Sequence, residues 1–253
     1  MISTEINTSK TNNDDVEEFF FSENLESPEQ LALAARIDMY AMLADMYRYP
    51  DVLTRVFVSS GEFKFHVLRI LENLPYEVSL SAEELELLTY PDGVLDDDVE
   101  AEYIRLFEAG PGNPPCPLVE GIHMDKEDGR RTIFKDLILF YNHFGLSYAE
   151  GNGEDQPDHI TYELEFLHYL AFLELRALQK NMSPAPLQQA QFDFLTRHPA
   201  KWTEQLSQRM KDIEDDLREG VNRGVVRFYR NVTALTHRCV TLDLNYLSRK
   251  IES

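Results

Sequence analysis

Apolar side chains recur every three or four residues through most of this sequence, and this helical spacing limits its fold more than any other feature. Residues 28–49 show the spacing clearly, with one apolar stripe formed by Leu33, Ile37, Tyr40, Ala44 and Tyr47. Alternating runs that would indicate strands are too short to be useful, and no repeat of fixed period is present. Helices joined by short breaks at Pro and Gly predict an all-α protein.

Helix start and stop signals divide the chain into a single-domain bundle of about nine to eleven helices. Ser27 can cap the first helix, with Pro28 at its first position and Gln30 completing a capping box, and Ser81 can cap a later helix. We expect the helical domain to cover residues 28–245. The predicted helices span about 28–49, 51–60, 62–73, 81–89, 97–109, 130–144, 157–180, 183–198, 199–220 and 221–241.

The two ends of the chain are predicted to lie outside this bundle. Residues 1–27 are polar and acid-rich apart from Val16 and a run of three Phe at 19–21, so we expect a mobile tail whose Phe cluster can dock on the body. Residues 246–253 are expected to form a short C-terminal tail. The start of the chain lacks the basic and apolar regions of a secretory signal, and no apolar run reaches the roughly 20 residues of a membrane helix. A cytoplasmic protein without stable membrane association is expected.

The charge balance restricts the partners that this chain can bind. The sequence has 45 acidic residues against 24 Lys and Arg, which gives a net charge of −21. Nucleic acids and anionic lipid surfaces are bound through Lys and Arg, so neither is an expected partner. An acidic surface steers basic partners instead, although it also serves simply to keep a protein soluble. The two cysteines, Cys116 and Cys239, are too few for a disulfide framework.

A segment with helical spacing at 102–109 is followed by the loop "GPGNPPCP" at 110–117. Tyr103, Leu106 and Phe107 share one face of that helix by their spacing, which usually indicates core packing. Gly110 is expected to end the helix with a positive φ. The four prolines hold the loop extended at little entropic cost, which suits either a rigid connector or a peptide-binding surface.

The polar segment "GNGEDQPDH" at 151–159 precedes the most apolar predicted helix. Asp155 or Gln156 can cap that helix, Pro157 fits its first turn, and Asp158 is favoured near the positive end of the helix dipole. His159 is less favourable there if charged, and Asp158 beside it can stabilise it.

The sequence lacks several common motifs of enzyme active sites. It has no phosphate-binding Gly-Lys-Ser loop, no dinucleotide fingerprint and no Gly-x-Ser-x-Gly. A metal site in a helical bundle, using His159, Glu163, Glu165 and His168, is kept as an alternative, although a surface pair on one helix is commoner. Packing at a helix junction explains His198 and Trp202.

The segments at 102–117 and 151–159, in this order, resemble the signatures of the TorD/DmsD/NarJ family of cytoplasmic chaperones for molybdenum-containing oxidoreductases. The first is an aromatic residue, two further residues and Leu-Phe before a Gly/Pro loop, here "YIRLF" and "GPGNPP". The second is Pro-Asp-His at the head of a helix, here "GEDQPDH". The segments "FLTRHPAKWTEQL" and "FYRNVTALT" also resemble the family, so the likeness covers about 30–240. The chain departs from the family after the prolines, where it carries "PLVEGIH" with Glu120 and His123.

The resemblance implies a TorD-like fold without enzymatic activity that binds the apo catalytic subunit, often through its twin-arginine leader, until the molybdenum cofactor is inserted and export can proceed. It implies no resident cofactor, although some relatives bind guanine nucleotide weakly. A monomer is expected, and the family also allows a domain-swapped dimer, for which 151–153 could act as a hinge.

On this hypothesis, Asp158 meets the arginines of the leader, His159 orients Asp158 or donates to the peptide, and the apolar part of the leader contacts the loop and the face before it. The full set of candidate binding residues is Tyr103, Leu106, Phe107, Pro114, Pro115, Glu120, His123, Asp158, His159 and Glu163. Recognition of the mature subunit, as in NarJ-like members, and a plain helical adaptor for another basic segment remain as alternatives.

Overall fold

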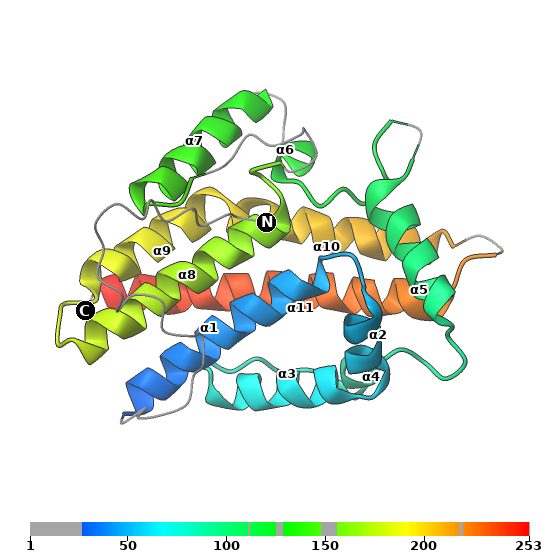
Figure 1. The fold of residues 1–253 in the computed structure, drawn as a ribbon, viewed down its shortest axis with the longest axis horizontal. Coiled ribbons are helices and arrows are strands. Elements are labelled where there is room, and N and C mark those ends of the chain that lie inside the picture. Colours follow the sequence, from blue (N-terminus) through cyan, green and yellow to red (C-terminus); the bar gives the residue numbers. More distant parts are fainter. Residues whose placement is uncertain (1–26, 111, 125–128, 148–155, 218–219, 253) are drawn as a thin grey trace, which may run out of the picture.

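The computed structural model of the chain describes residues 27–110, 112–124, 129–147, 156–217 and 220–252 (Figure 1). These residues form helices without any strand, and their one isolated β-bridge joins Val119 to His159. The all-α prediction is therefore confirmed. The expected N-terminal tail, apart from Ser27, and the proposed hinge at 151–153 lie outside the described residues.

The helices follow one another with short connections. In chain order they are α1 (Pro28–Met46), α2 (Val52–Ser59), α3 (Glu62–Asn73), α4 (Ala82–Glu86), α5 (Asp96–Tyr103), the π-helical turn η1 (Ile104–Glu108), α6 (Glu120–His123), α7 (Gly129–His143), α8 (Ile160–Gln179), α9 (Ala185–Arg197), α10 (Pro199–Asp215) and α11 (Arg223–Glu252).

Local capping signals fixed several of these starts. The Ser27 hydroxyl accepts a hydrogen bond from the Gln30 amide at 3.2 Å, and Ser81 forms a reciprocal capping box with Glu84. Pro199 begins α10, where its missing N–H costs no helical hydrogen bond. These predicted starts are confirmed.

The core forms where α8 packs against α1 and α9, and where α11 packs against α9 and α10. The long helix α11 runs through the molecule, with α7 at one edge and α3 at the opposite edge (Figure 1). Trp202, Tyr229 and Phe166 are among the largest fully buried side chains. None of the described helices combines the length and the apolar character that crossing a bilayer requires.

Several predictions about where helices begin and end were wrong. The helix expected at 97–109 changes at Ile104 into a π-helical turn, closed by a bond from the Ala109 amide to the Ile104 carbonyl at 2.7 Å. The short helix α6 was not predicted. The expected tail at 246–253 is helical as far as Glu252, because Leu247 is buried in the core.

Candidate functional site

The proline loop lies against the body of the molecule and is held there through its backbone. Arg209 on α10 donates from Nε to the Pro115 carbonyl at 2.6 Å, and the Cys116 amide donates to the Leu106 carbonyl at 2.8 Å. The His123 ring nitrogen Nε2 lies 2.7 Å from the Pro117 carbonyl. These three backbone groups of the loop, two carbonyls and one amide, are thus hydrogen-bonded by residues of α10, η1 and α6.

Position 110 requires glycine because the backbone of Asn113 and Pro114 lies close to it. The prediction of a positive φ at Gly110 was wrong. Within this loop the positive φ belongs to Gly112, at 95°. A Cβ atom on Gly110 would lie 2.6 Å from the carbonyl oxygen of Asn113, so the loop could not fold back over this point with any larger residue.

The segment after the prolines pairs with the residues at the head of α8. The Glu120 amide donates to the Asp158 carbonyl, and the Ile160 amide donates to the Leu118 carbonyl, both at 2.9 Å. This extended pairing explains why α8 begins at Ile160 with His159 as its N-cap, so the predicted cap at Asp155 or Gln156 is wrong. The pairing places Asp158 and His159 beside the segment that directly follows the proline loop.

Asp158 is fully buried, and its carboxylate is bonded within the chain. Its Oδ2 accepts from the Gly121 amide at 3.0 Å and lies 3.4 Å from Nε of Arg130 on α7. Burial raises the pKa of Asp158, although the Gly121 bond and the charge of Arg130 oppose that shift. Asp158 therefore holds α6 and α7 against the head of α8.

His159, the next residue, is half-buried and acts locally. Its Nδ1 accepts from the Thr161 amide at 3.3 Å, which caps the first turn of α8. The expected capping function near this position is thus performed by the histidine itself.

Two further acids converge on the same place from α6 and α8. The Glu120 carboxylate lies 2.9 Å from Nδ1 of His198, at the junction of α9 and α10. Glu163 accepts from the indole N–H of Trp202 at 3.0 Å. Burial raises the pKa of Glu163 well above its usual range, and the nearby Glu120 carboxylate adds to the shift. No Lys or Arg among the described residues is paired with Glu163.

His123 completes this group of residues, which we call the α8-head cluster: Glu120, His123, Arg130, Asp158, Glu163, His198 and Trp202. The His123 ring stacks on Trp202 with centroids 5.2 Å apart and an interplanar angle of 29°. Burial lowers the pKa of His123 because it disfavours the charged imidazole. The cluster is a buried polar network rather than an open catalytic cleft.

The predicted apolar face at 103–107 forms part of the core. Tyr103, Leu106 and Phe107 are all buried, and Tyr103 donates from its hydroxyl to the Tyr47 carbonyl at 2.8 Å. Phe107 packs edge-to-face on Tyr229 with centroids 5.0 Å apart. Leu106 also bonds to the loop, because its carbonyl accepts from the Cys116 amide.

The structure thus divides the ten predicted residues into three groups. Glu120, His123, Asp158, His159 and Glu163 come together at the head of α8. Pro114 and Pro115 are half-buried in the adjoining loop, and the remaining three lie in the core. Whether any of them contacts a client stays a prediction.

Sequence reasoning missed Arg130 and Arg209 and treated His198 and Trp202 as packing alone. The one available signal was spacing: Trp202, Leu206 and Arg209 lie on one face of α10, and Leu206 and Trp202 are fully buried. The partners of Arg130 could not be inferred, because Asp158 is distant in sequence and buried charges are bonded across elements.

The residues of the alternative metal site are bonded elsewhere. Glu165 pairs with Arg48, and His168 Nδ1 lies 3.1 Å from the Ile37 carbonyl. Within the described ranges, no group of three or more His, Cys, Asp or Glu side chains is arranged to hold a metal ion.

The chain is similar to several known proteins. A family profile described as nitrate reductase delta subunit matches residues 72–208. The chain is 35% identical over 175 residues to the chlorate reductase assembly chaperone protein of Ideonella dechloratans, covering 69% of this chain and 76% of that protein. It is 30% identical over 188 residues to the selenate reductase assembly chaperone protein of Thauera selenatis, covering 74% and 80%. A solved redox enzyme maturation protein from Archaeoglobus fulgidus is 17% identical, with a TM-score of 0.42 over 87% of this chain and 96% of that one.

Proposed function

Because the chain belongs to the nitrate reductase delta subunit family, we propose that it is an assembly chaperone for the catalytic subunit of a molybdenum-containing oxidoreductase. The proposal rests on sequence similarity. The chain is 30–35% identical, over 69–74% of its length, to proteins named as reductase assembly chaperones. In this function the chain binds a partner and performs no chemistry itself. It acts on the apo subunit and holds it until the cofactor is inserted.

We also propose that the chaperone recognises the twin-arginine leader of its client. The net charge of −21 favours encounter with a basic segment, and it raises the association rate at low salt. Binding of the leader while the subunit is incomplete would hold back export.

The α8-head cluster supplies a specific route for this recognition. The Arg130 guanidinium lies on the Asp158 carboxylate at 3.4–3.5 Å, which is a long contact for such a pair, and its side chain is one-third exposed. An arginine of the leader can reach Asp158 by replacing Arg130. Arg130 would then act as an internal competitor that sets the affinity for the leader.

Recognition of the mature subunit is a second candidate. It is favoured by the burial of Asp158, Glu163 and the aromatic face at 103–107, since a surface that binds a leader directly would expose more of these groups. In that case the cluster is structural and a different surface contacts the client.

The leader proposal is tested by calorimetry with a synthetic peptide that carries a twin-arginine motif followed by an apolar segment. Asp158→Asn should weaken binding at least about tenfold, because the loss of a charged hydrogen bond costs about 1.5–3 kcal/mol. Arg130→Ala should tighten binding several-fold by removing the competitor, and His159→Ala should weaken it.

Arg131→Ala is the matched control, because Arg131 is the exposed neighbour of Arg130 on α7. Circular dichroism must show unchanged helix content in every variant. Unchanged affinity in both Asp158→Asn and Arg130→Ala, together with co-purification of a subunit that lacks its leader, would favour recognition of the mature body.

A further inference from the structure

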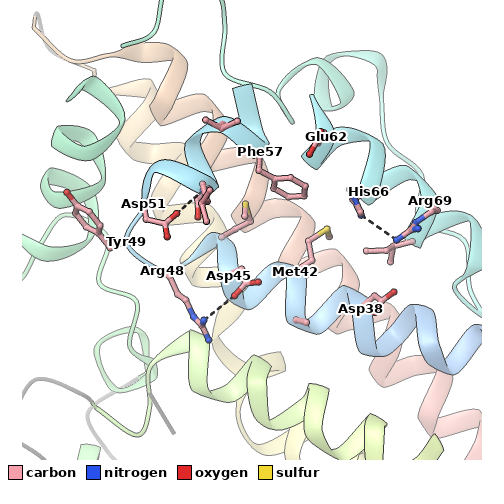
Figure 2. Close-up of a pocket in the computed structure, with 16 residues that line it drawn as sticks. Asp38, Met42, Asp45, Arg48, Tyr49, Asp51, Phe57, Glu62, His66 and Arg69 are labelled. Carbon is pink, nitrogen blue, oxygen red and sulfur yellow. Dashed lines mark hydrogen bonds and ion pairs between the residues drawn. The ribbon is translucent and has the colours of Figure 1, made fainter. Parts of the chain in front are cut away.

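An open groove lies between α1, α2 and α3, and it shares no residue with the α8-head cluster (Figure 2). Its volume is about 780 Å³, which is within the usual range for small-molecule sites. The close-up shows Met42 on α1 and Phe57 on α2 directed toward one another in the space between the helices. The groove is therefore formed by helix faces that are only partly covered by their neighbours.

The lining is apolar at its base and at one rim. Met42 and Phe57 are half-buried against the core, whereas Leu53 is 78% exposed and Val56 is 59% exposed on the outer side of α2. Val52 on α2 and Phe65 and Leu68 on α3 are also exposed, outside the lining of the groove. Exposed apolar side chains that gather at a groove often mark an interaction site, and methionine adapts its shape to different partners.

Acids line the groove on all three helices. They are Asp38 and Asp45 on α1, Asp51 at the N-cap of α2 and Glu62 at the start of α3, against two arginines, Arg48 and Arg69. Arg48 is already paired with Asp45 at 3.3 Å and with Glu165 outside the groove.

Asp38 and Asp45 stand two helical turns apart on α1, which places them about 10 Å from each other along the groove. Burial raises the pKa of Asp38 against the opposing charge of Arg69, so this carboxylate would gain from a further cation. An apolar floor beside two acids in helical register is complementary to one side of an amphipathic basic helix.

We propose that this groove docks an amphipathic helical segment of the client subunit, with apolar side chains over Met42 and Phe57 and Arg or Lys side chains on Asp38 and Asp45. The inference rests on the proposed function for the identity of the client. It adds a second contact surface, separate from the loop and the head of α8.

Charge argues against two other occupants. Residues 1–26 of this chain carry seven acids and one lysine, so the groove would repel them in spite of their Phe cluster. A second copy of the chain carries the same net charge of −21 and would be repelled as a whole.

The groove is tested first with a synthetic probe, an 18-residue helical peptide of about equal parts Leu, Ala, Lys and Arg with one apolar face. In fluorescence anisotropy, Leu53→Ser/Val56→Ser and Asp38→Asn/Asp45→Asn should each weaken binding about tenfold, since each pair removes contacts worth roughly 1.4 kcal/mol or more. The controls Leu139→Ser, at a site 68% exposed on α7, and Asp92→Asn should bind like the natural chain. Equal affinity for all variants would overturn the inference.

The same variants are then co-expressed with the catalytic subunit. Loss of co-purification in the groove variants alone supports the inference, whereas retention in all of them refutes it and leaves the proposed function intact. If the natural chain itself fails to co-purify the subunit, the proposed function fails, and the peptide titration still decides the groove.

A photo-crosslinker at position 53 of the full chain identifies the occupant. Adducts with the catalytic subunit support the proposal. Adducts confined to residues 1–26 or to a second copy would contradict it.

Discussion

Two buried glutamates on α8 show how strongly the environment decides what a residue contributes. Glu174 receives hydrogen bonds from Arg36 at 3.2 Å, from Gln188 at 2.7 Å and from Gln191 at 2.8 Å. Glu163, three turns earlier, receives one bond from a neutral indole and lies near another carboxylate. Glu174 therefore has a buried guanidinium and two amides as partners, whereas burial and the nearby Glu120 carboxylate raise the pKa of Glu163.

Glu163→Gln and Glu174→Gln should have opposite effects on stability. The amide introduced by Glu163→Gln needs no proton and still accepts from Trp202, so this change should raise the unfolding free energy at neutral pH by on the order of 1 kcal/mol. Glu174→Gln should lower it by about 2–4 kcal/mol, because it leaves Arg36 with one buried carboxylate fewer. Urea unfolding followed by circular dichroism measures both.

The pH dependence gives an independent check on Glu163. Its folded-state pKa is raised, so above the ordinary value of 4.5 the unfolded chain releases a proton that the folded chain still holds. The contribution of Glu163 to stability is therefore complete at low pH and is lost as pH rises toward the folded-state pKa. The gain from Glu163→Gln should grow as pH rises above about 4.5 toward the folded-state pKa. A constant difference would show that Glu163 is ionised in the folded protein.

At the scale of elements, the proline loop depends on a helix almost a hundred residues away. Arg209 on α10 holds the Pro115 carbonyl, and this contact fixes the loop beside the head of α8. Local sequence predicted an extended loop and the following helix, because proline and capping chemistry act over a few residues. It placed the start of α8 too early, since the pairing of Asp158–Ile160 with Leu118–Glu120 is a long-range contact.

Arg209→Ala should release the loop without unfolding the bundle. The hydrogen bond from a charged donor contributes about 1.5–3 kcal/mol, so the Cys116 amide, which bonds to Leu106, should exchange at least about tenfold faster. Lys211→Ala, an exposed change on the same helix, is the control. Hydrogen exchange with mass spectrometry measures the effect, and unchanged exchange would show that packing alone holds the loop.

At the scale of the whole molecule, one buried guanidinium joins four helices. Arg36 on α1 donates to Asp243 on α11 at 2.6 and 2.8 Å, to Glu174 on α8 at 3.2 Å and to Gln191 on α9 at 2.7 Å. Tyr40 adds a bond to Asp243 at 2.6 Å. This network fixes the relative positions of helices whose apolar faces could pack in several registers.

Arg36→Met should destabilise the protein by about 3–5 kcal/mol, because two buried carboxylates lose their cation. The combined change Arg36→Met/Asp243→Leu/Glu174→Gln should recover part of that loss, since it removes the unpaired charges as well. Thermal and urea unfolding compare the variants. An Arg36→Met protein as stable as the natural chain would show that the network adds nothing to stability.

Local sequence was enough to predict the helical class, most helix positions, the caps at Ser27 and Ser81, and a resemblance to the family through two signatures. These follow from periodicity, propensity and neighbouring residues, which act over a few positions along the chain. Three features became visible only in the folded molecule: Tyr103 and Phe107 lie in the core, Asp158 is paired with Arg130, and α1, α2 and α3 form a groove lined by acidic and apolar residues. Such features depend on which surfaces of helices distant in sequence pack together. This packing decides which side chains are buried, paired or exposed, and a local stretch of sequence does not contain that information.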